Sequence, residues 1–192
     1  MKKLKKNFII SLIGVDGAGK TTLAKKLHKT IKNSQYLHLK PYIIFKNYIT
    51  VIKNPHREKK SSLIFSLIRL FSWLLSYKFF FFFNQKKKFY IFDRYAHDIL
   101  IDPLRYKHNL SRKLTKLILN FFPKPDLWVF VNPLLKTIKH RKLELPVIEL
   151  KRQIKDYTCF FKNKKNVLML DTSVKKEKLI KQIVKKINNQ LK

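Results

Sequence analysis

Apolar runs and amphipathic segments alternate along the chain. Five short apolar runs have the length expected of strands in a sheet. They occupy residues 8–13, 36–39, 89–92, 127–131 and 167–170, of which 36–39 is the weakest. Four longer segments place apolar residues at helical spacing, at residues 21–31, 110–122, 146–161 and 175–191. Strands that alternate with helices favour a parallel sheet covered on both faces, so the pattern predicts an α/β fold with five parallel strands.

The most hydrophobic stretch is residues 63–83, which is about long enough to span a bilayer. Arg69 and Lys78 interrupt it, and a charge near the centre of a membrane is energetically costly. We therefore expect no transmembrane span. The stretch is interpreted as a long helix packed on the sheet, with Arg69 facing a ligand or solvent. A loose membrane association stays open.

Two further segments complete the pattern. Residues 45–60 are ambiguous and are interpreted as a loop plus a helix, whereas Pro133 suits the first turn of a helix that runs to about Arg141. The length of 192 residues suits one domain, residues 1–192, with a small lid.

The formal net charge of +33 raises the question of a nucleic-acid partner. Of the 44 Lys and Arg residues, 7 are Arg. Specific nucleic-acid binders favour Arg, whose planar fork pairs with phosphates and guanines. We therefore interpret the lysines as a solvated surface that attracts small anions, and do not expect a nucleic-acid partner.

Cys159 is the only cysteine, which excludes an intrachain disulfide and fits a reducing compartment. The basic residues 1–6 and the apolar run 8–13 imitate a signal peptide, but the run is short and leads directly into a loop with glycines. The run is assigned to the first strand, and we expect a cytoplasmic location.

The segment from Gly14 to Thr21 fits the pattern G-x-x-x-x-G-K-[ST] of phosphate-binding loops, between an apolar strand and an amphipathic helix. All three glycines of the chain lie in it, and backbone that approaches phosphate closely needs glycine. Backbone N–H groups would face the phosphates of ATP, Lys20 would bridge the β and γ phosphates, and Thr21 would bind Mg²⁺. The nucleotide-binding residues predicted in this way are Gly14, Val15, Asp16, Gly17, Ala18, Gly19, Lys20, Thr21 and Thr22.

A second polar motif follows another apolar strand. Asp93 and Arg94 come at the carboxyl end of the run 89–92, where ligands bind in open α/β sheets. Asp93 could hold Mg²⁺ through water or orient the acceptor oxygen, and Arg94 could neutralise a phosphate. A strand-end salt bridge is the alternative.

Together these motifs resemble the thymidylate kinases, a branch of the nucleoside monophosphate kinases with a three-layer α/β/α P-loop NTPase fold. Residues 16–22 are similar to their phosphate-binding loop, and residues 93–95 to their second signature. Residues 125–127, then Pro133 and Arg141, resemble their third region. The likeness touches most of the chain, and the phosphate-binding loop is its most specific part.

The resemblance implies an acceptor site. Asp16 would face the sugar of the acceptor and Arg94 its phosphate, and Tyr95 of the same signature is predicted to bind the acceptor with them. Arg69 falls roughly where the family keeps an acceptor-binding arginine.

The resemblance also implies a lid that supplies positive charge. Because Ala18 is not basic, Arg141 and Lys142 in or beside a very short lid are the candidates to stabilise the transferring phosphate. The predicted catalytic residues are therefore Lys20, Asp93, Arg94 and Arg141, with Thr21 and Asp93 at the metal.

The chain departs from the family after Tyr95. The serine and the Ala-Tyr-Gln element that reads thymine are replaced by residues 96–106, and Asn132 stands where an aspartate is common. Asp98, Asp102 and Arg105 could read the acceptor or be surface charges. His97 is a proton shuttle, a stacking residue or a structural histidine.

These observations predict an enzyme, a kinase that uses ATP and Mg²⁺ to phosphorylate a nucleoside monophosphate, with dTMP as the leading acceptor. A nucleoside, a sugar or a glycan-pathway metabolite is an alternative acceptor, and a non-catalytic nucleotide-binding module is an alternative class. Asp93, Arg94 and Arg141 favour the enzyme, since a binding module would not need them. Whether the chain forms a homodimer is left open.

Overall fold

The computed structural model describes residues 6–41, 60–84, 88–133 and 146–191. The predicted helix from Pro133 to Arg141, the lid arginine itself and nearly all of residues 45–60 lie outside these ranges. In chain order the elements are β1 (Phe8–Ile13), α1 (Lys20–Thr30), β2 (Ser34–His38), α2 (Leu63–Phe83), β3 (Phe89–Asp93), the 3₁₀ helices η2 (Ala96–Leu100) and η3 (Leu104–Tyr106), α3 (Arg112–Leu119), β4 (Leu127–Asn132), α5 (Val147–Phe161), β5 (Val167–Asp171) and α6 (Lys176–Gln190).

The chain divides into two compact units. Residues 1–38, 86–95 and 125–192 form the sheet unit, which holds all five described strands. Residues 39–85 and 96–124 form the helical unit, which holds α2, α3 and both 3₁₀ helices. The single functional domain expected from the chain length stays a prediction.

The sheet unit confirms the predicted α/β fold, with five parallel strands in the order β2-β3-β1-β4-β5. The three central strands are buried, whereas the edge strands β2 and β5 are partly exposed. In the register, Asp93 lies opposite Leu12 on one side and His38 on the other. Because the strands are parallel, the loop after β1 and the end of β3 meet at the same edge of the sheet.

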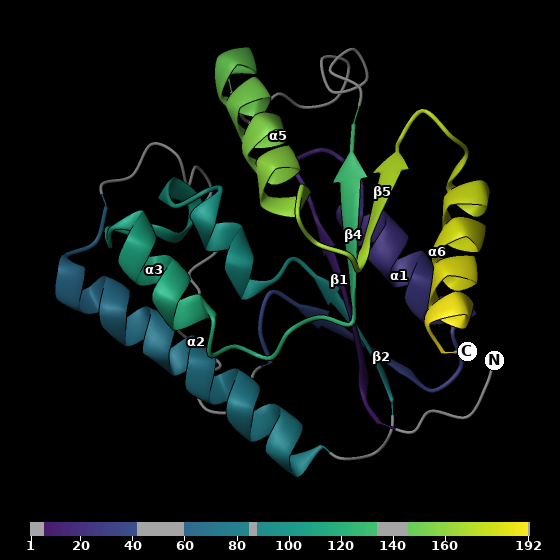
Figure 1. The fold of residues 1–192 in the computed structure, drawn as a ribbon, viewed down its shortest axis with the longest axis horizontal. Coiled ribbons are helices and arrows are strands. Elements are labelled where there is room, and N and C mark those ends of the chain that lie inside the picture. The colour runs from purple at the N-terminus through teal and green to yellow at the C-terminus, as the bar shows by residue number, and fades with distance from the viewer. Residues whose placement is uncertain (1–5, 42–59, 85–87, 134–145, 192) are drawn as a thin grey trace. The chain divides into compact units, whose positions relative to one another are not determined.

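Helices cover the two faces of this sheet (Figure 1). Against β4, the α5 helix packs Tyr157 and Phe161 on the ring of Phe130, with centroid distances of 5.4 and 5.5 Å. Figure 1 shows α1 and α6 on the other side, where the two helices contact each other. An apolar core between a sheet and helices on both faces is what fixes the positions of the strand ends.

Within the helical unit, α2 packs beside α3 (Figure 1). Ser62 caps α2 by accepting a hydrogen bond of 3.3 Å from the backbone N–H of Phe65. Trp73 packs edge-on against Tyr106, at 5.4 Å between ring centroids, and the Tyr77 hydroxyl donates to the Leu39 carbonyl. These contacts tie the inner face of α2 to the rest of the unit.

The boundaries of two elements differ from the sequence pattern. The weak strand expected at 36–39 is β2 at Ser34–His38, because Leu39 adopts a positive φ of 56° and leaves the strand. The helix expected at 110–122 is the shorter α3, which begins after its cap Ser111 and ends at Leu119.

Among the described helices α2 alone is long and apolar enough to cross a membrane. Of its most apolar stretch of 18 residues, 33% is buried inside the protein.

Candidate active site

The loop between β1 and α1 approaches β4 so closely that only glycine fits at its start. A Cβ atom on Gly14 would lie 2.5 Å from the carbonyl oxygen of Val131, which real Cβ atoms essentially never do. At the other end of the loop Gly19 precedes α1 in the left-handed region, at φ 90°. The loop is therefore compact, and the N-terminus of α1 opens directly onto it, as an anion-binding loop requires.

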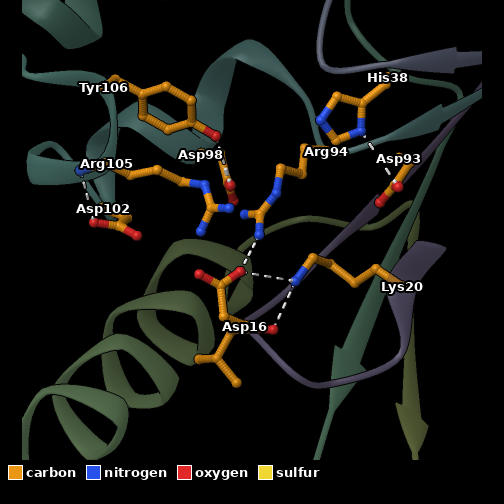
Figure 2. A network of polar contacts seen from close by, with 10 residues as sticks. Asp16, Lys20, His38, Asp93, Arg94, Asp98, Asp102, Arg105 and Tyr106 are labelled. Atoms are coloured by element: carbon orange, nitrogen blue, oxygen red, sulfur yellow. Dashed lines mark hydrogen bonds and ion pairs between the residues drawn. The ribbon is translucent and has the colours of Figure 1, made fainter. Parts of the chain in front are cut away.

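A largely buried cluster of three charged side chains lies at this loop (Figure 2). The ammonium of Lys20 donates a hydrogen bond of 2.6 Å to the carbonyl of Val15 and lies 3.9 Å from Asp16 Oδ1. The same Asp16 oxygen accepts a hydrogen bond from the guanidinium of Arg94. Two cations thus converge on one carboxylate, and such a concentration of buried positive charge suits a ligand with phosphates.

Asp93 ends β3 as a fully buried carboxylate. Its Oδ2 accepts a hydrogen bond of 3.0 Å from the Tyr36 hydroxyl and lies 3.4 Å from His38 Nδ1. Burial alone would raise the pKa of this carboxyl. Hydrogen bonds from His38 and Thr21, together with nearby positive charge, outweigh burial and lower the pKa of Asp93 from 3.8 to about 2. Asp93 is therefore ionised at any physiological pH.

The donor set around Asp93 fits Mg²⁺. The Oδ1 atom of this ionised carboxylate is buried with no hydrogen-bond partner, and the hydroxyl of Thr21 adjoins the same side chain. Carboxylate and hydroxyl oxygens are hard ligands of the kind Mg²⁺ takes beside nucleotide phosphates.

The sheet unit thus brings together most of the predicted site residues, namely Gly14 to Thr22, Asp93 and Arg94. Tyr95 also belongs to this unit, but its ring is fully buried and packs edge-on against Phe92 and Trp128. Burial first, and the charge of Asp126 second, raise the pKa of the Tyr95 hydroxyl well above its usual value. The Tyr95 ring is therefore part of the apolar core next to Arg94.

Arg69 belongs to the helical unit. Its guanidinium donates to the carbonyl of Tyr106 and, at 2.9 Å, to the hydroxyl of Ser61. Through these two bonds Arg69 attaches both the segment before α2 and the end of η3 to the α2 helix. The acceptor-binding role that the resemblance implies for Arg69 stays a prediction.

The charged residues after Tyr95 are not a solvated surface. Asp98 and Asp102 are 0% and 3% exposed. Asp98 accepts a hydrogen bond of 3.0 Å from the Tyr106 hydroxyl, and Asp102 accepts one of 3.2 Å from the backbone N–H of Arg105 (Figure 2). The two aspartates therefore organise the turn of residues 96–106, and His97 of this segment packs its ring against Phe122 at 6.5 Å.

Tyr36 and His38 are site residues that the sequence pattern did not single out. They lie on the weak edge strand β2, and they contact Asp93, which is 57 and 55 positions further along the chain, through the β2–β3 register. The signal available in the sequence was the alternation of polar Tyr36 and His38 on one face of a strand, which says nothing of the strand that it pairs with.

No family model matches the sequence. The chain is 30% identical over 187 residues to the "Probable thymidylate kinase" of Sulfurisphaera tokodaii, and the alignment covers 91% of this chain and 93% of that protein. The chain belongs to the thymidylate kinase family. As a member of the thymidylate kinase family it is a P-loop kinase.

Solved structures match at the level of the fold. A thymidylate kinase from Candida albicans superposes with a TM-score of 0.65 at 16% identity, covering 97% of this chain and 94% of its own. A deoxyadenosine kinase from M. mycoides has a TM-score of 0.61 at 17% identity, over 95% and 99% of the two chains. A thymidylate kinase from Ehrlichia chaffeensis has a TM-score of 0.60 at 13% identity, over 93% and 97%. The thymidylate kinase fold therefore extends over nearly the whole chain.

Proposed function

We propose that this kinase transfers the γ-phosphoryl group of ATP to dTMP. An oxygen of the acceptor phosphate forms a new bond to the γ-phosphorus, the bond from that phosphorus to the β–γ bridging oxygen breaks, and ADP and dTDP are the products. The observation that carries the proposal is the sequence likeness to a thymidylate kinase along 91% of the chain. A cytoplasmic location belongs to the same proposal.

The phosphate-binding loop would position the donor. Its backbone N–H groups and the N-terminus of α1 face the phosphates, and Lys20 exchanges its bond to the Val15 carbonyl for the β and γ oxygens. Thr21 and Asp93 would hold Mg²⁺, which would supply positive charge beside the phosphates. Since the protein does little covalent chemistry in phosphoryl transfer, it contributes mainly by positioning the substrates and by supplying positive charge.

Asp16 and Arg94 would bind the acceptor. Their ion pair lies beside Lys20, so an acceptor phosphate that takes the place of the Asp16 carboxylate on Arg94 enters next to the γ-phosphate. Asp16 is then free to accept a hydrogen bond from the acceptor's sugar. Arg141 is assigned to transition-state charge through the family resemblance alone. The buried Tyr95 is left out of this acceptor site.

A coupled ADP-release assay with ATP and Mg²⁺ tests the acceptor. We expect dTMP to stimulate ADP release more than other nucleoside monophosphates, nucleosides or sugars. The alternative acceptors arise because residues 96–106 replace the thymine-reading element. Stimulation by a nucleoside or a sugar, with none by dTMP, would reject dTMP and leave the kinase assignment standing.

Substitution of the acceptor-binding arginine separates the two substrates. Arg94→Ala is expected to raise the KM for the acceptor and to lower kcat, with ATP binding nearly unchanged, because Arg94 acts on the acceptor phosphate alone. Arg152→Ala is the matched control, since Arg152 is exposed on α5 and pairs with Glu149 and Asp156. Equal effects of the two substitutions would remove Arg94 from the acceptor site.

A further inference from the structure

The edge strand β2 contributes two polar side chains to the surroundings of Asp93, and neither has a role in the function proposed above. Tyr36 and His38 are two positions apart, so they lie on the same face of the strand. His38 lies opposite Asp93 in the β2–β3 register, which places the Asp93 side chain on that face as well. The α1 helix, whose first turn carries Thr21, contacts both strands.

The backbone at Asp93 is fixed from the other side, by β1. Asp93 pairs with Leu12 in the register, and the next N–H, that of Arg94, donates a hydrogen bond of 2.9 Å to the Leu12 carbonyl. Arg94 takes a positive φ of 74°, which residues other than glycine disfavour, and β3 ends directly before it. With the backbone held in this way, rotation of the Asp93 side chain alone decides where its two carboxylate oxygens lie.

The two oxygens of Asp93 have different surroundings. Oδ2 accepts a hydrogen bond of 3.0 Å from the Tyr36 hydroxyl and lies 3.4 Å from Nδ1 of the half-exposed His38 (Figure 2 shows His38 and Asp93). Oδ1 is buried and has no hydrogen-bond partner within the described part of the chain. A buried carboxylate oxygen without a partner is energetically costly, and a cation is a partner that would satisfy it. Oδ2 is thus engaged by protein, whereas Oδ1 is left for a ligand.

Other donors near Asp93 would compete for this carboxylate if it could rotate. The hydroxyl of Thr21 adjoins it, and the positive charge of Lys20 acts on it. A carboxylate that rotated onto Lys20 would form an ion pair, which would occupy both the ammonium assigned to phosphate and the oxygen assigned to the metal. A hydrogen bond from the neutral Tyr36 hydroxyl to Oδ2 opposes this rotation without adding charge to the site.

We infer that Tyr36 is a positioning residue for the metal ligand: its hydroxyl holds Oδ2 of Asp93, so that Oδ1 stays available to Mg²⁺ beside the phosphate-binding loop. His38 supports the same orientation through its longer contact. The inference rests on the role proposed above for Asp93 at the metal, and it gives Tyr36 no contact with either substrate. Loss of a hydrogen bond to a metal-binding carboxylate typically weakens metal binding about tenfold or more.

Titration with Mn²⁺, followed by electron paramagnetic resonance of the free ion, tests this role without any turnover. Mn²⁺ takes the carboxylate and hydroxyl oxygens that also suit Mg²⁺. The titration uses full-length protein in excess over adenylyl imidodiphosphate, an ATP analogue whose β–γ bridge is nitrogen. Tyr36→Phe, which removes only the hydroxyl, should weaken Mn²⁺ binding about tenfold. Affinity for the analogue in the absence of metal should equal that of wild type.

Tyr106→Phe is the matched control. The Tyr106 hydroxyl also donates a hydrogen bond of 3.0 Å to a buried aspartate, Asp98, but in the helical unit. Each substitution removes one such bond, so both variants are expected to melt at a somewhat lower temperature. Only Tyr36→Phe is expected to change the Mn²⁺ affinity.

A double-substitution cycle measures whether Tyr36 acts through Asp93. Asp93→Asn should itself weaken Mn²⁺ binding, and the addition of Tyr36→Phe to this variant should cause no further loss. His38→Ala should weaken binding by a smaller factor than Tyr36→Phe, since Nδ1 lies 3.4 Å from the carboxylate. If Tyr36→Phe does not fold, His38→Ala and its combination with Asp93→Asn provide the same test.

Three outcomes would overturn the inference. Wild-type Mn²⁺ affinity in Tyr36→Phe, with weaker binding in Asp93→Asn, would remove Tyr36 from the site and leave Asp93 as a metal ligand. Equal losses in Tyr36→Phe and Tyr106→Phe would reduce Tyr36 to a general contribution to stability. Wild-type affinity in Asp93→Asn would reject the metal ligand itself. Transfer to dTMP is decided separately by the ADP-release assay, so failure of the acceptor and failure of this inference are distinguishable.

Discussion

The charged side chains at the phosphate-binding loop form ion pairs with one another, so their charges largely cancel. Asp16 accepts from Arg94 and lies 3.9 Å from the ammonium of Lys20. Such a carboxylate keeps two buried cations in place at the loop where we propose that phosphate binds. Under the proposed function, binding of phosphate would exchange one anion for another, which avoids the larger free energy of bringing charge into an uncompensated site.

Replacement of Lys20 by alanine removes the one ammonium inside the loop. We expect Lys20→Ala to lower turnover by at least about 100-fold, because the cation that stabilises the transferring phosphoryl group is lost. The fold should survive, since the hydrogen bond from Lys20 to the Val15 carbonyl lies within the loop. Steady-state ADP release and circular dichroism measure the two effects.

The control for this variant is Lys25→Ala, an exposed lysine on the same helix. Turnover by Lys25→Ala should equal that of wild type. Turnover by Lys20→Ala within a few-fold of wild type would contradict the role of the loop in transfer.

At the scale of elements, His108 links the turn before α3 to α3 itself. Its Nε2 lies 2.7 Å from Thr115 Oγ1, and because that hydroxyl donates to the Ser111 carbonyl, Nε2 carries the proton. Nδ1 is buried without a partner. Burial first, then the charges of Arg69 and Lys60, lower the pKa of His108 from 6.5 to about 4.

This pKa makes the helical unit sensitive to acid. Between pH 6.5 and 4 the unfolded chain binds a proton at His108 that the folded chain does not, so the free energy of unfolding rises with pH. The stabilisation is fully present above pH 6.5 and is lost as the pH falls towards 4, on the order of 3 kcal/mol. His108→Gln, measured by urea unfolding at several pH values, should flatten this profile. His28→Gln, a change at an exposed histidine of α1, should leave it steep. Parallel profiles for all three proteins would contradict the assignment.

The sequence predicts the helices and strands better than it predicts the contacts between them. The five strands, the long helix and the phosphate-binding loop follow from apolar periodicity and from a glycine pattern within eight consecutive residues. The approach of Gly14 to Val131 of β4, which requires the first of these glycines, is a contact between distant parts of the sequence. The contact of His38 with Asp93 depends on strand pairing over 55 residues, which no local pattern contains. The face of α2 that is buried could not be predicted either, because apolar residues surround that helix and no polar side marks the solvent.

The whole molecule carries far more positive than negative charge, so the positive side chains of the folded protein repel one another. Added salt screens this repulsion, with a Debye length of about 10 Å at 0.1 M. We therefore expect the Tm of the nucleotide-free protein to rise as NaCl increases from about 0.05 to about 0.5 M. Differential scanning calorimetry measures it, with sucrose at equal osmolality as the uncharged control. A Tm that falls with salt would mean that the few surface ion pairs, such as Lys26 with Glu177, outweigh the net charge.

The central claim, that the phosphate-binding loop transfers a phosphoryl group from ATP to dTMP, is tested most directly by ³¹P NMR of the reaction mixture. With ATP, Mg²⁺ and dTMP, the wild-type protein should produce the resonances of ADP and dTDP in equal amounts. The Lys20→Ala variant should leave both substrates unchanged over the same time. Formation of ADP with inorganic phosphate and no dTDP, or equal dTDP from both proteins, would contradict the account.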